Sequence, residues 1–333
     1  MPPMVCFGYS DDQGLVSDRH INHYSERSQD GPGIMIIEAT AVMKEGRAAV
    51  SQLGIWSDEH ISGLSSLAST IKNNGALSII QLHHAGLLSP EPVDPIAGGP
   101  TADEKNPRTR TLEIHEIEKI SNAFIHAAIR AQKAGFDGVE LHGAHGYLLN
   151  QFANSIINKR EDAYGKDFTG RMKLITGIID GIKAHCRDQF ILGCRMGANT
   201  PTLEAGIELA KYLERLRLDY LSVSHGGMLI NLPRPPKDFD YNWIVYSGTR
   251  IKMEVNIPVM VVNEIRSLER ASHLIEKRLT DIVLIGRPLL ADPHWVSHVC
   301  KNGPVNLCLN CRPKCRWYEN SSFCPARKKM NPS

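Results

Sequence analysis

Eight short apolar runs alternate with longer amphipathic segments along almost the whole chain, and this alternation is the strongest constraint on the fold. The predicted strands are Met4–Phe7, Ile34–Glu38, Leu77–Leu82, Gly138–His142, Phe190–Met196, Tyr220–Ser224, Val259–Val262 and Ile282–Ile285. The predicted helices are Asp18–Asp30, Ser57–Asn74, Glu113–Gly135, Thr169–Arg187, Pro201–Arg217, Trp243–Val255, Ser267–Lys277 and Pro288–Lys301. Eight strand–helix units predict a parallel (β/α)8 TIM barrel. An open doubly wound sheet is the alternative, disfavoured because no Gly-x-Gly-x-x-Gly turn follows a strand.

Helix starts and domain limits follow from local chemistry. Ser57, Thr169 and Ser267 stand where a side-chain oxygen can accept a hydrogen bond from an orphan amide, so they are expected to cap helices. The barrel is expected to span residues 1–302, and a short cysteine-rich segment is expected at 303–333. Long polar connections after the third and fourth predicted strands are typical of binding loops or of disorder.

Charge and hydropathy narrow the class of partner. Lys and Arg total 38 against 36 for Asp and Glu, a net charge of +2, so no large excess of positive charge exists to bind nucleic acid or an anionic membrane. A small-molecule partner is favoured. No window approaches eighteen consecutive apolar residues, and the N-terminus lacks the charged and apolar regions of a secretory signal. We therefore expect a cytoplasmic protein, whose start is either trimmed or naturally short.

Polar residues replace apolar ones at seven of the eight predicted strand ends, where a TIM barrel builds its catalytic face. The fourth end is the richest, because His142, His145 and Tyr147 lie between an apolar strand and an apolar helical pattern. Imidazoles can donate hydrogen bonds and a phenol can release a proton. In isolation the two histidines are more simply explained as core-lining residues. The polar groups at the other strand ends favour a functional site.

Four cysteines form the second strong pattern, Cys-x2-Cys-x3-Cys-x8-Cys, at Cys308, Cys311, Cys315 and Cys324. In a cytosolic protein this spacing favours metal over disulfides. Four thiolates can converge on tetrahedral zinc or on a 4Fe–4S cluster, and free thiols are the third interpretation.

Seven fragments, each at a predicted strand end or in the loop after it, carry a family resemblance. They are PPM (Pro2–Met4), IIEATAV (Ile36–Val42), GIWSDEHI (Gly54–Ile61), QLHHAG (Gln81–Gly86), GFDGVELHGAHGYLLNQF (Gly135–Phe152), NKREDAYG (Asn158–Gly165) and IGRPLLADP (Ile285–Pro293). In this order they resemble the Old Yellow Enzyme family of flavin-dependent ene-reductases, in particular the branch of 2,4-dienoyl-CoA and 2-enoate reductases. The C-x2-C-x3-C start resembles the 4Fe–4S segment of that branch.

The resemblance implies FMN across the top of the barrel. The residues it assigns to FMN are Pro3, Met4, Cys6 (or Val5 in the competing register), Ala39, Gln81, His142, Arg195, Asn263, Gly286 and Arg287. Arg195 is implied at the N1–C2=O edge of the flavin, and Gly286 with Arg287 at the phosphate. Relatives commonly carry a Gly pair after the seventh strand, whereas this chain has Asn263 and Glu264. A carboxylate there would repel a phosphate.

The resemblance also implies a reaction. His142 and His145 match the pair that hydrogen-bonds the activating oxygen of an enone, enoate or enoyl thioester, and Tyr147 matches the proton donor that completes hydride transfer from flavin N5. The strand-six histidine of the dienoyl-CoA branch aligns with Met228, which leaves His225 as a weaker candidate. Electrons are expected from NAD(P)H or, through the cluster, from a separate donor protein; homo-oligomers are common in the family. Amine demethylation on the same fold and a non-catalytic electron-transfer module are the alternatives.

Overall fold

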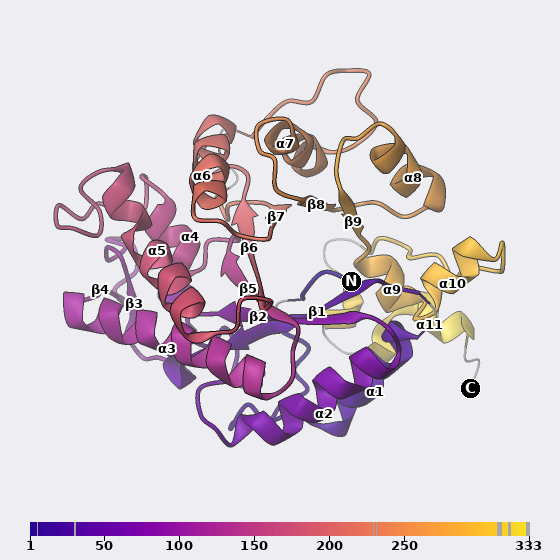
Figure 1. Ribbon diagram of the computed structural model, residues 1–333, viewed down its shortest axis with the longest axis horizontal. Helices are drawn as coiled ribbons and strands as arrows, with labels where there is room; N and C mark the ends of the chain where they lie inside the picture. Colours follow the sequence, from indigo (N-terminus) through magenta and orange to yellow (C-terminus); the bar gives the residue numbers. More distant parts are fainter. Residues whose placement is uncertain are drawn as a thin grey trace.

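Seven parallel strands form one curled sheet, and helices cover its outer face (Figure 1). The computed structural model describes residues 1–4, 6–29, 31–228, 230, 232–311, 315–318 and 321–330. The strands in spatial order are β1 (Ile34–Ala41), β2 (Leu77–His83), β5 (Gly138–Gly143), β6 (Ile191–Gly197), β7 (Tyr220–Ser224), β8 (Val259–Val262) and β9 (Ile282–Leu284). Every neighbouring pair is parallel. The TIM-barrel type of fold predicted from the alternation is therefore confirmed.

The strand predicted at Met4–Phe7 is wrong, because none of the described residues in that range belongs to a strand. The N-terminal segment nevertheless lies along β1, where the amide of Ile36 donates to the carbonyl of Met1 at 3.1 Å and the amide of Ala39 donates to that of Met4 at 2.8 Å. The two prolines between Met1 and Met4 have no amide hydrogen, so they cannot contribute donors to a regular ladder.

Helices occupy the predicted connections with small shifts at their ends, and two further short helices, at Leu148–Ala153 and Pro325–Met330, were not among the predicted helices. Their bounds are α1 (Asp18–Ser28), α2 (His60–Asn73), α3 (Ile114–Lys133), α4 (Leu148–Ala153), α5 (Phe168–His185), α6 (Leu203–Arg215), α7 (Trp243–Lys252), α8 (Leu268–Glu276), α9 (Arg287–Ala291), α10 (Trp295–Cys300) and α11 (Pro325–Met330). Ser267 caps α8 as predicted. Asp167, and not Thr169, caps α5, accepting a backbone amide hydrogen at 2.8 Å. Ser57 lies before the first turn of α2 and is not its cap residue.

The helix predicted at Pro288–Lys301 is divided into α9 and α10. The break falls at Asp292, because the following Pro293 disfavours a helical conformation in the residue before it. The Asp292 carboxylate is fully buried, and it lies 2.8 Å from Nδ1 of His298 and accepts the amide hydrogen of Asn306 at 3.0 Å. At the break, the Asp292 carboxylate therefore links α10 to the start of the cysteine-rich segment.

The long connection after β2 is ordered. It holds a two-stranded parallel ribbon of β3 (Ala97–Gly99) and β4 (Thr109–Thr111). Arg160, from the loop after α4, donates to the carbonyls of Pro100 at 3.1 Å and Leu112 at 2.7 Å, which ties the two long loops together. Within the described ranges, no helix is long and apolar enough to cross a membrane.

The cysteine segment packs against α1 and α9, beside the N-terminal segment (Figure 1). Trp317 is 3 % exposed, and the guanidinium of Arg27 on α1 lies 5.3 Å from its ring centroid. The side chain of Asn306 donates to the carbonyls of Ala291 and Ala326, each at 2.8 Å. The segment is thus held close to the carboxyl ends of the last strands, and the domain limit at residue 302 stays a prediction.

Candidate functional site

A cavity of about 540 Å³ opens at the carboxyl ends of the strands, between the N-terminal segment and the loops after β5 to β9. Parallel strands place their carboxyl ends on one face of a barrel, so these loops converge although they are far apart in sequence. The predicted site residues that line the cavity are Pro3, Met4, His145, Tyr147, Arg195, His225, Asn263, Gly286 and Arg287.

Two glycine-containing loops press together at one wall of the cavity. The amide of His145 donates to the carbonyl of His225 at 2.9 Å, and the two imidazole centroids are 4.6 Å apart. Gly146 and Gly227 both have positive φ, and a Cβ on Gly227 would collide with the backbone of Gly146. Glycine is required for this approach. The approach brings the β5 and β7 loops into one site.

Three imidazoles form a hydrogen-bonded chain beneath the cavity. Nδ1 of His83 lies 3.0 Å from Nδ1 of His142, and Nε2 of His142 lies 2.7 Å from Nδ1 of His145. Nε2 of His145 lies 2.7 Å from the hydroxyl of Ser224. The Tyr147 ring meets His83 edge-on at 4.4 Å and His142 at 5.0 Å. The residues predicted at the end of the fourth strand are therefore held as one unit.

Burial decides the protonation of this unit. Desolvation holds the pKa of His142 and of His145 well below the usual histidine value, and the nearby positive charge of Arg195 adds to the effect. Both rings are therefore neutral at physiological pH, and each has one N–H to donate. Desolvation raises the pKa of Tyr147, so its phenol keeps its proton. The site can donate hydrogen bonds and one proton without carrying charge on these groups.

Arg195 supplies a buried positive charge at the end of β6. The residue is 7 % exposed, and its guanidinium donates to the carbonyl of Pro3 at 2.9 Å and to the hydroxyl of Ser224 at 3.5 Å. Behind it, burial raises the pKa of Glu140 to about 7, and the charge of Arg195 opposes that rise. A fixed cation at the cavity wall is suited to the N1–C2=O edge of a flavin, which gathers negative charge on reduction.

The far end of the cavity fits a phosphate by charge. Two guanidiniums, of Arg266 and Arg287, and one carboxylate, of Glu264, line this end, which leaves one positive charge in excess; Arg195 adds a third guanidinium at the other end of the cavity. Gly286 lines this end as well, and a Cβ there would lie 3.4 Å from the Pro2 ring, an ordinary van der Waals contact. The described residues therefore fit a group that joins an aromatic ring system to a dianion, as FMN does.

Four of the described residues assigned to FMN do not belong to the lining of this cavity: Cys6, Ala39, Gln81 and His142, whose ring contacts the lining residue His145. Gln81 is fully buried and donates to the Glu140 carboxylate at 2.8 Å; Ala39 lies within β1. The thiol of Cys6 lies 3.7 Å from a backbone carbonyl, and burial with the charge of Glu38 raises its pKa to about 12. Val5, the competing assignment, lies outside the described residues.

The four predicted metal ligands come together around a second, small cavity. It is lined by Cys308, Cys311, Cys315 and Cys324, together with Arg287 and Trp317 among others. All four cysteines are free of disulfides. Within the described ranges, no group of three or more His, Cys, Asp or Glu has the arrangement of a formed metal site. Arg287 and Cys315 line both cavities, so the two share a wall.

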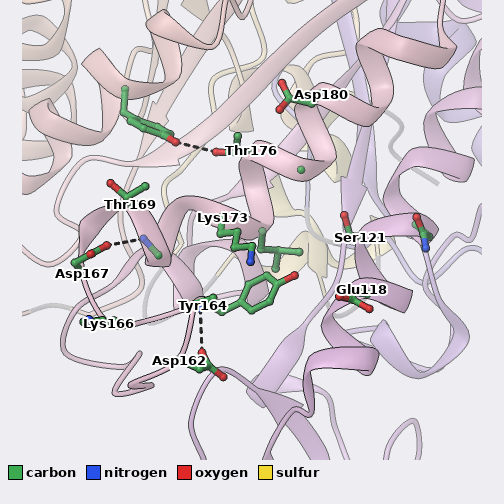
Figure 2. Close-up of a pocket in the computed structure, with 16 residues that line it drawn as sticks. Glu118, Ser121, Asp162, Tyr164, Lys166, Asp167, Thr169, Lys173, Thr176 and Asp180 are labelled. Carbon is green, nitrogen blue, oxygen red and sulfur yellow. Dashed lines mark hydrogen bonds between the residues drawn. The ribbon is translucent and has the colours of Figure 1, made fainter.

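Another cavity lies between α3 and α5 on the outside of the barrel (Figure 2). Its volume is about 720 Å³, and acidic and basic side chains are mixed on its walls, among them Glu118, Asp162, Lys166 and Lys173. At its edge, the hydroxyl of Tyr212 lies 3.0 Å from the hydroxyl of Thr176. No strand end contributes to it, so we place the chemistry at the barrel mouth.

Several site residues were not predicted from the sequence. Ser224 is the last residue of a predicted strand, and nothing local marks it as the partner of His145 and Arg195. Arg266 lies in an ordinary polar loop. Asn310 stands between two of the cysteines and accepts a hydrogen bond from Arg287. The sequence did not reveal these residues because each owes its place in the site to a contact with a distant segment, and residue spacing does not show such contacts.

Comparison with known proteins agrees with this geometry. The sequence profile of the NADH:flavin oxidoreductase / NADH oxidase family matches residues 1–306. An NADH oxidase of Thermoanaerobacter brockii is 36% identical over 330 residues, which is 95% of this chain and 50% of that protein. An NADPH dehydrogenase of Clostridium acetobutylicum is 34% identical over 325 residues, which is 92% of this chain and 91% of that protein.

Solved structures give the same fold. A 2-naphthoyl-CoA reductase in complex with 2-naphthoyl-CoA superimposes with a TM-score of 0.84 at 26% identity, covering 96% of this chain and 53% of that chain. An old yellow enzyme homologue from Zymomonas mobilis superimposes at 0.79 with 23% identity, over 93% and 90% of the two chains. The chain thus spans about half the length of the NADH oxidase and of the naphthoyl-CoA reductase. It belongs to the NADH:flavin oxidoreductase / NADH oxidase family, the Old Yellow Enzyme family of flavin oxidoreductases.

Proposed function

We propose that this protein is an FMN-dependent ene-reductase that reduces a C=C bond activated by a neighbouring carbonyl, carboxylate or thioester. The observation that carries the proposal is the unit of His142, His145 and Tyr147, which is held against a cavity that fits a flavin. FMN, when bound, supplies the hydride. The protein must then bind the activating oxygen and provide a proton.

The two histidines and the tyrosine divide those tasks. His142 and His145 are neutral, and their proposed role is to donate hydrogen bonds to the substrate oxygen, where negative charge grows as the alkene is reduced. These bonds would replace contacts that the two rings make with His83, with each other and with Ser224. Tyr147 lies at the N-terminal cap of α4, at the cavity wall, with its phenol protonated. Its role is to deliver that proton to the α-carbon. His225, whose ring faces His145, is the second candidate for substrate contact.

We assign the chain to the branch of dienoyl-CoA and enoate reductases. The support is the convergence of Cys308, Cys311, Cys315 and Cys324 on one cavity next to the flavin cavity. These four thiols would hold a 4Fe–4S cluster, which would supply one-electron chemistry beside the flavin. The likeness to a reductase bound to an acyl-CoA favours a thioester among the substrate classes.

The two alternative functions are disfavoured by the cavity. An amine demethylase must bind an alkylammonium, which aromatic rings recognise. Among the described lining residues, Tyr147 is the only tyrosine, phenylalanine or tryptophan, and the lining carries excess positive charge that repels a cation. A module that only transfers electrons has no use for a proton-bearing tyrosine beside two neutral histidines.

Anaerobic turnover with cyclohexenone or cinnamate tests the proposal, with NADH and NADPH supplied separately. We expect loss of the alkene and bleaching of bound flavin by at least one of the two nucleotides. The reduced product is identified by mass, because saturation of the C=C bond adds two hydrogen atoms to the substrate. Flavin that is bleached while no alkene is consumed, across enone, enoate and enoyl thioester, would contradict the reductase assignment.

A further inference from the structure

Glu264 places a carboxylate at the end of the cavity that carries the excess positive charge. It follows β8, and both Asn263 and Glu264 have positive φ, of 111° and 54°. This conformation is unfavourable for residues with a Cβ and is retained where the surroundings hold it. The Glu264 carboxylate lies 3.1 Å from the guanidinium of Arg266 and 3.7 Å from that of Arg287. The turn therefore brings an anion between two arginines.

The two arginines are also the groups suited to a ligand phosphate. Arg266 and Arg287 line the same cavity as Glu264, while Arg195 is engaged at its other end with Pro3 and Ser224. A phosphate that enters between them must displace the carboxylate or lie against it. Like charges at such separation repel, and the phosphate would replace the ion pairs that Glu264 makes with Arg266 and Arg287.

We propose that Glu264 is a built-in counter-anion that competes with the FMN phosphate for Arg266 and Arg287. In consequence, the site discriminates weakly between FMN and riboflavin, which has the same ring system but no phosphate. Pro3, Tyr147 and Arg195, which would hold the ring system, line a different part of the cavity, so Glu264 would act on the phosphate alone.

Flavin titration of the apoprotein tests this inference. The dissociation constants of FMN and of riboflavin are measured by quenching of flavin fluorescence for the wild type, Glu264→Gln and Glu276→Gln. Glu264→Gln is expected to lower the FMN constant about fivefold and to leave the riboflavin constant within about twofold, as expected for one partly exposed charge interaction. Glu276→Gln, an exposed glutamate at the end of α8, removes the same charge and should change neither constant.

A second variant guards against misfolding of the first. Glu264→Asn removes the same charge, and asparagine adopts positive φ more readily than most residues, so the turn is preserved. It should reproduce the fivefold change. The proposal would be overturned if Glu264→Gln and Glu264→Asn both bind FMN more weakly than the wild type or leave its dissociation constant unchanged. An equal change in the dissociation constants of FMN and riboflavin would also overturn it.

The inference concerns cofactor binding and goes beyond the proposed reaction. If both flavins bind and Glu264→Gln shifts their ratio while no alkene is reduced, the inference stands and the ene-reductase proposal fails. If alkenes are reduced and the ratio is unmoved by Glu264→Gln, the inference fails and the reaction stands.

Discussion

The backbone and the ring of His145 are both held by contacts with residues at another strand end. Its backbone has a φ of 63°, its amide is bonded to the His225 carbonyl, and its ring lies between His142 and Ser224. These contacts fix the orientation of the imidazole ring. The His145 N–H therefore points to His142 or to Ser224, and in the proposed reaction the substrate oxygen takes the place of one of these two partners.

Tyr147→Phe tests the proton donor at the residue scale. The change removes one hydroxyl and keeps the ring that packs on His83 and His142, so flavin binding and bleaching by NAD(P)H should be unchanged. Alkene reduction should slow about 10²-fold or more, the usual contribution of general acid catalysis. The measurement is stopped-flow reoxidation of the reduced enzyme by cyclohexenone. Tyr212→Phe, in the outer cavity of Figure 2, is the matched control and should have no effect.

His145→Ala provides an independent reading of the same site. It removes the ring and one hydrogen-bond donor, so it should weaken binding of the activating oxygen and slow reoxidation while the flavin stays bound. Wild-type reoxidation rates in both Tyr147→Phe and His145→Ala would refute the assignment of this unit to catalysis.

At the scale of elements, the segment after α10 links two sites. The guanidinium of Arg287, the first residue of α9, donates a hydrogen bond to the side chain of Asn310, which stands between two of the cysteines. It also lies 3.7 Å from the Glu264 carboxylate in the cavity at the barrel mouth. Cys315 lines that cavity as well as the smaller one. A group held by the cysteines would therefore lie next to the phosphate end of the flavin site. This arrangement arises because the broken helix after β9 turns the chain back across the barrel mouth.

Cys311→Ser tests the metal centre of this element. Iron and acid-labile sulfide are assayed on anaerobically purified wild type, which should contain about four of each per chain. Loss of one thiolate ligand should deplete both. Cys300→Ser, an exposed cysteine on α10, should keep the wild-type content. Zinc without sulfide in the wild type, or no metal at all, would rule out the cluster.

At the scale of the whole molecule, two buried carboxyls lie on strands of the sheet, Glu38 on β1 and Glu140 on β5. Burial raises the pKa of Glu140 to about 7 and that of Glu38 to about 8, in each case against hydrogen bonds that lower it. A carboxyl whose pKa is higher in the folded state binds a proton there that the unfolded chain has released. Stability from such a group is present below the unfolded pKa and is lost as the pH rises through the folded one.

Glu140→Gln should make that loss visible. For Glu140 the window runs from about 4.5, the ordinary value, to about 7. The difference in unfolding free energy, variant minus wild type, should therefore become more positive between pH 5 and pH 8, because the variant has no proton to lose. Urea unfolding at the two pH values measures it. A difference that stays constant or falls would show that Glu140 is ionised in the fold at pH 5.

The sequence by itself determined the barrel, the unit of His142, His145 and Tyr147, and the set of four cysteines between Cys308 and Cys324. The reason is that strand and helix periods and short motifs depend on residues close together in the chain, so the sequence alone shows them. Ser57, Thr169 and the first strand were misplaced, since caps and strand ladders depend on which amides lack partners in the folded chain. Only the tertiary structure decided that Ser224 and His83 extend the histidine chain, and that Glu264 faces two arginines. Those contacts join segments from different strand ends, and only closure of the sheet brings such ends together.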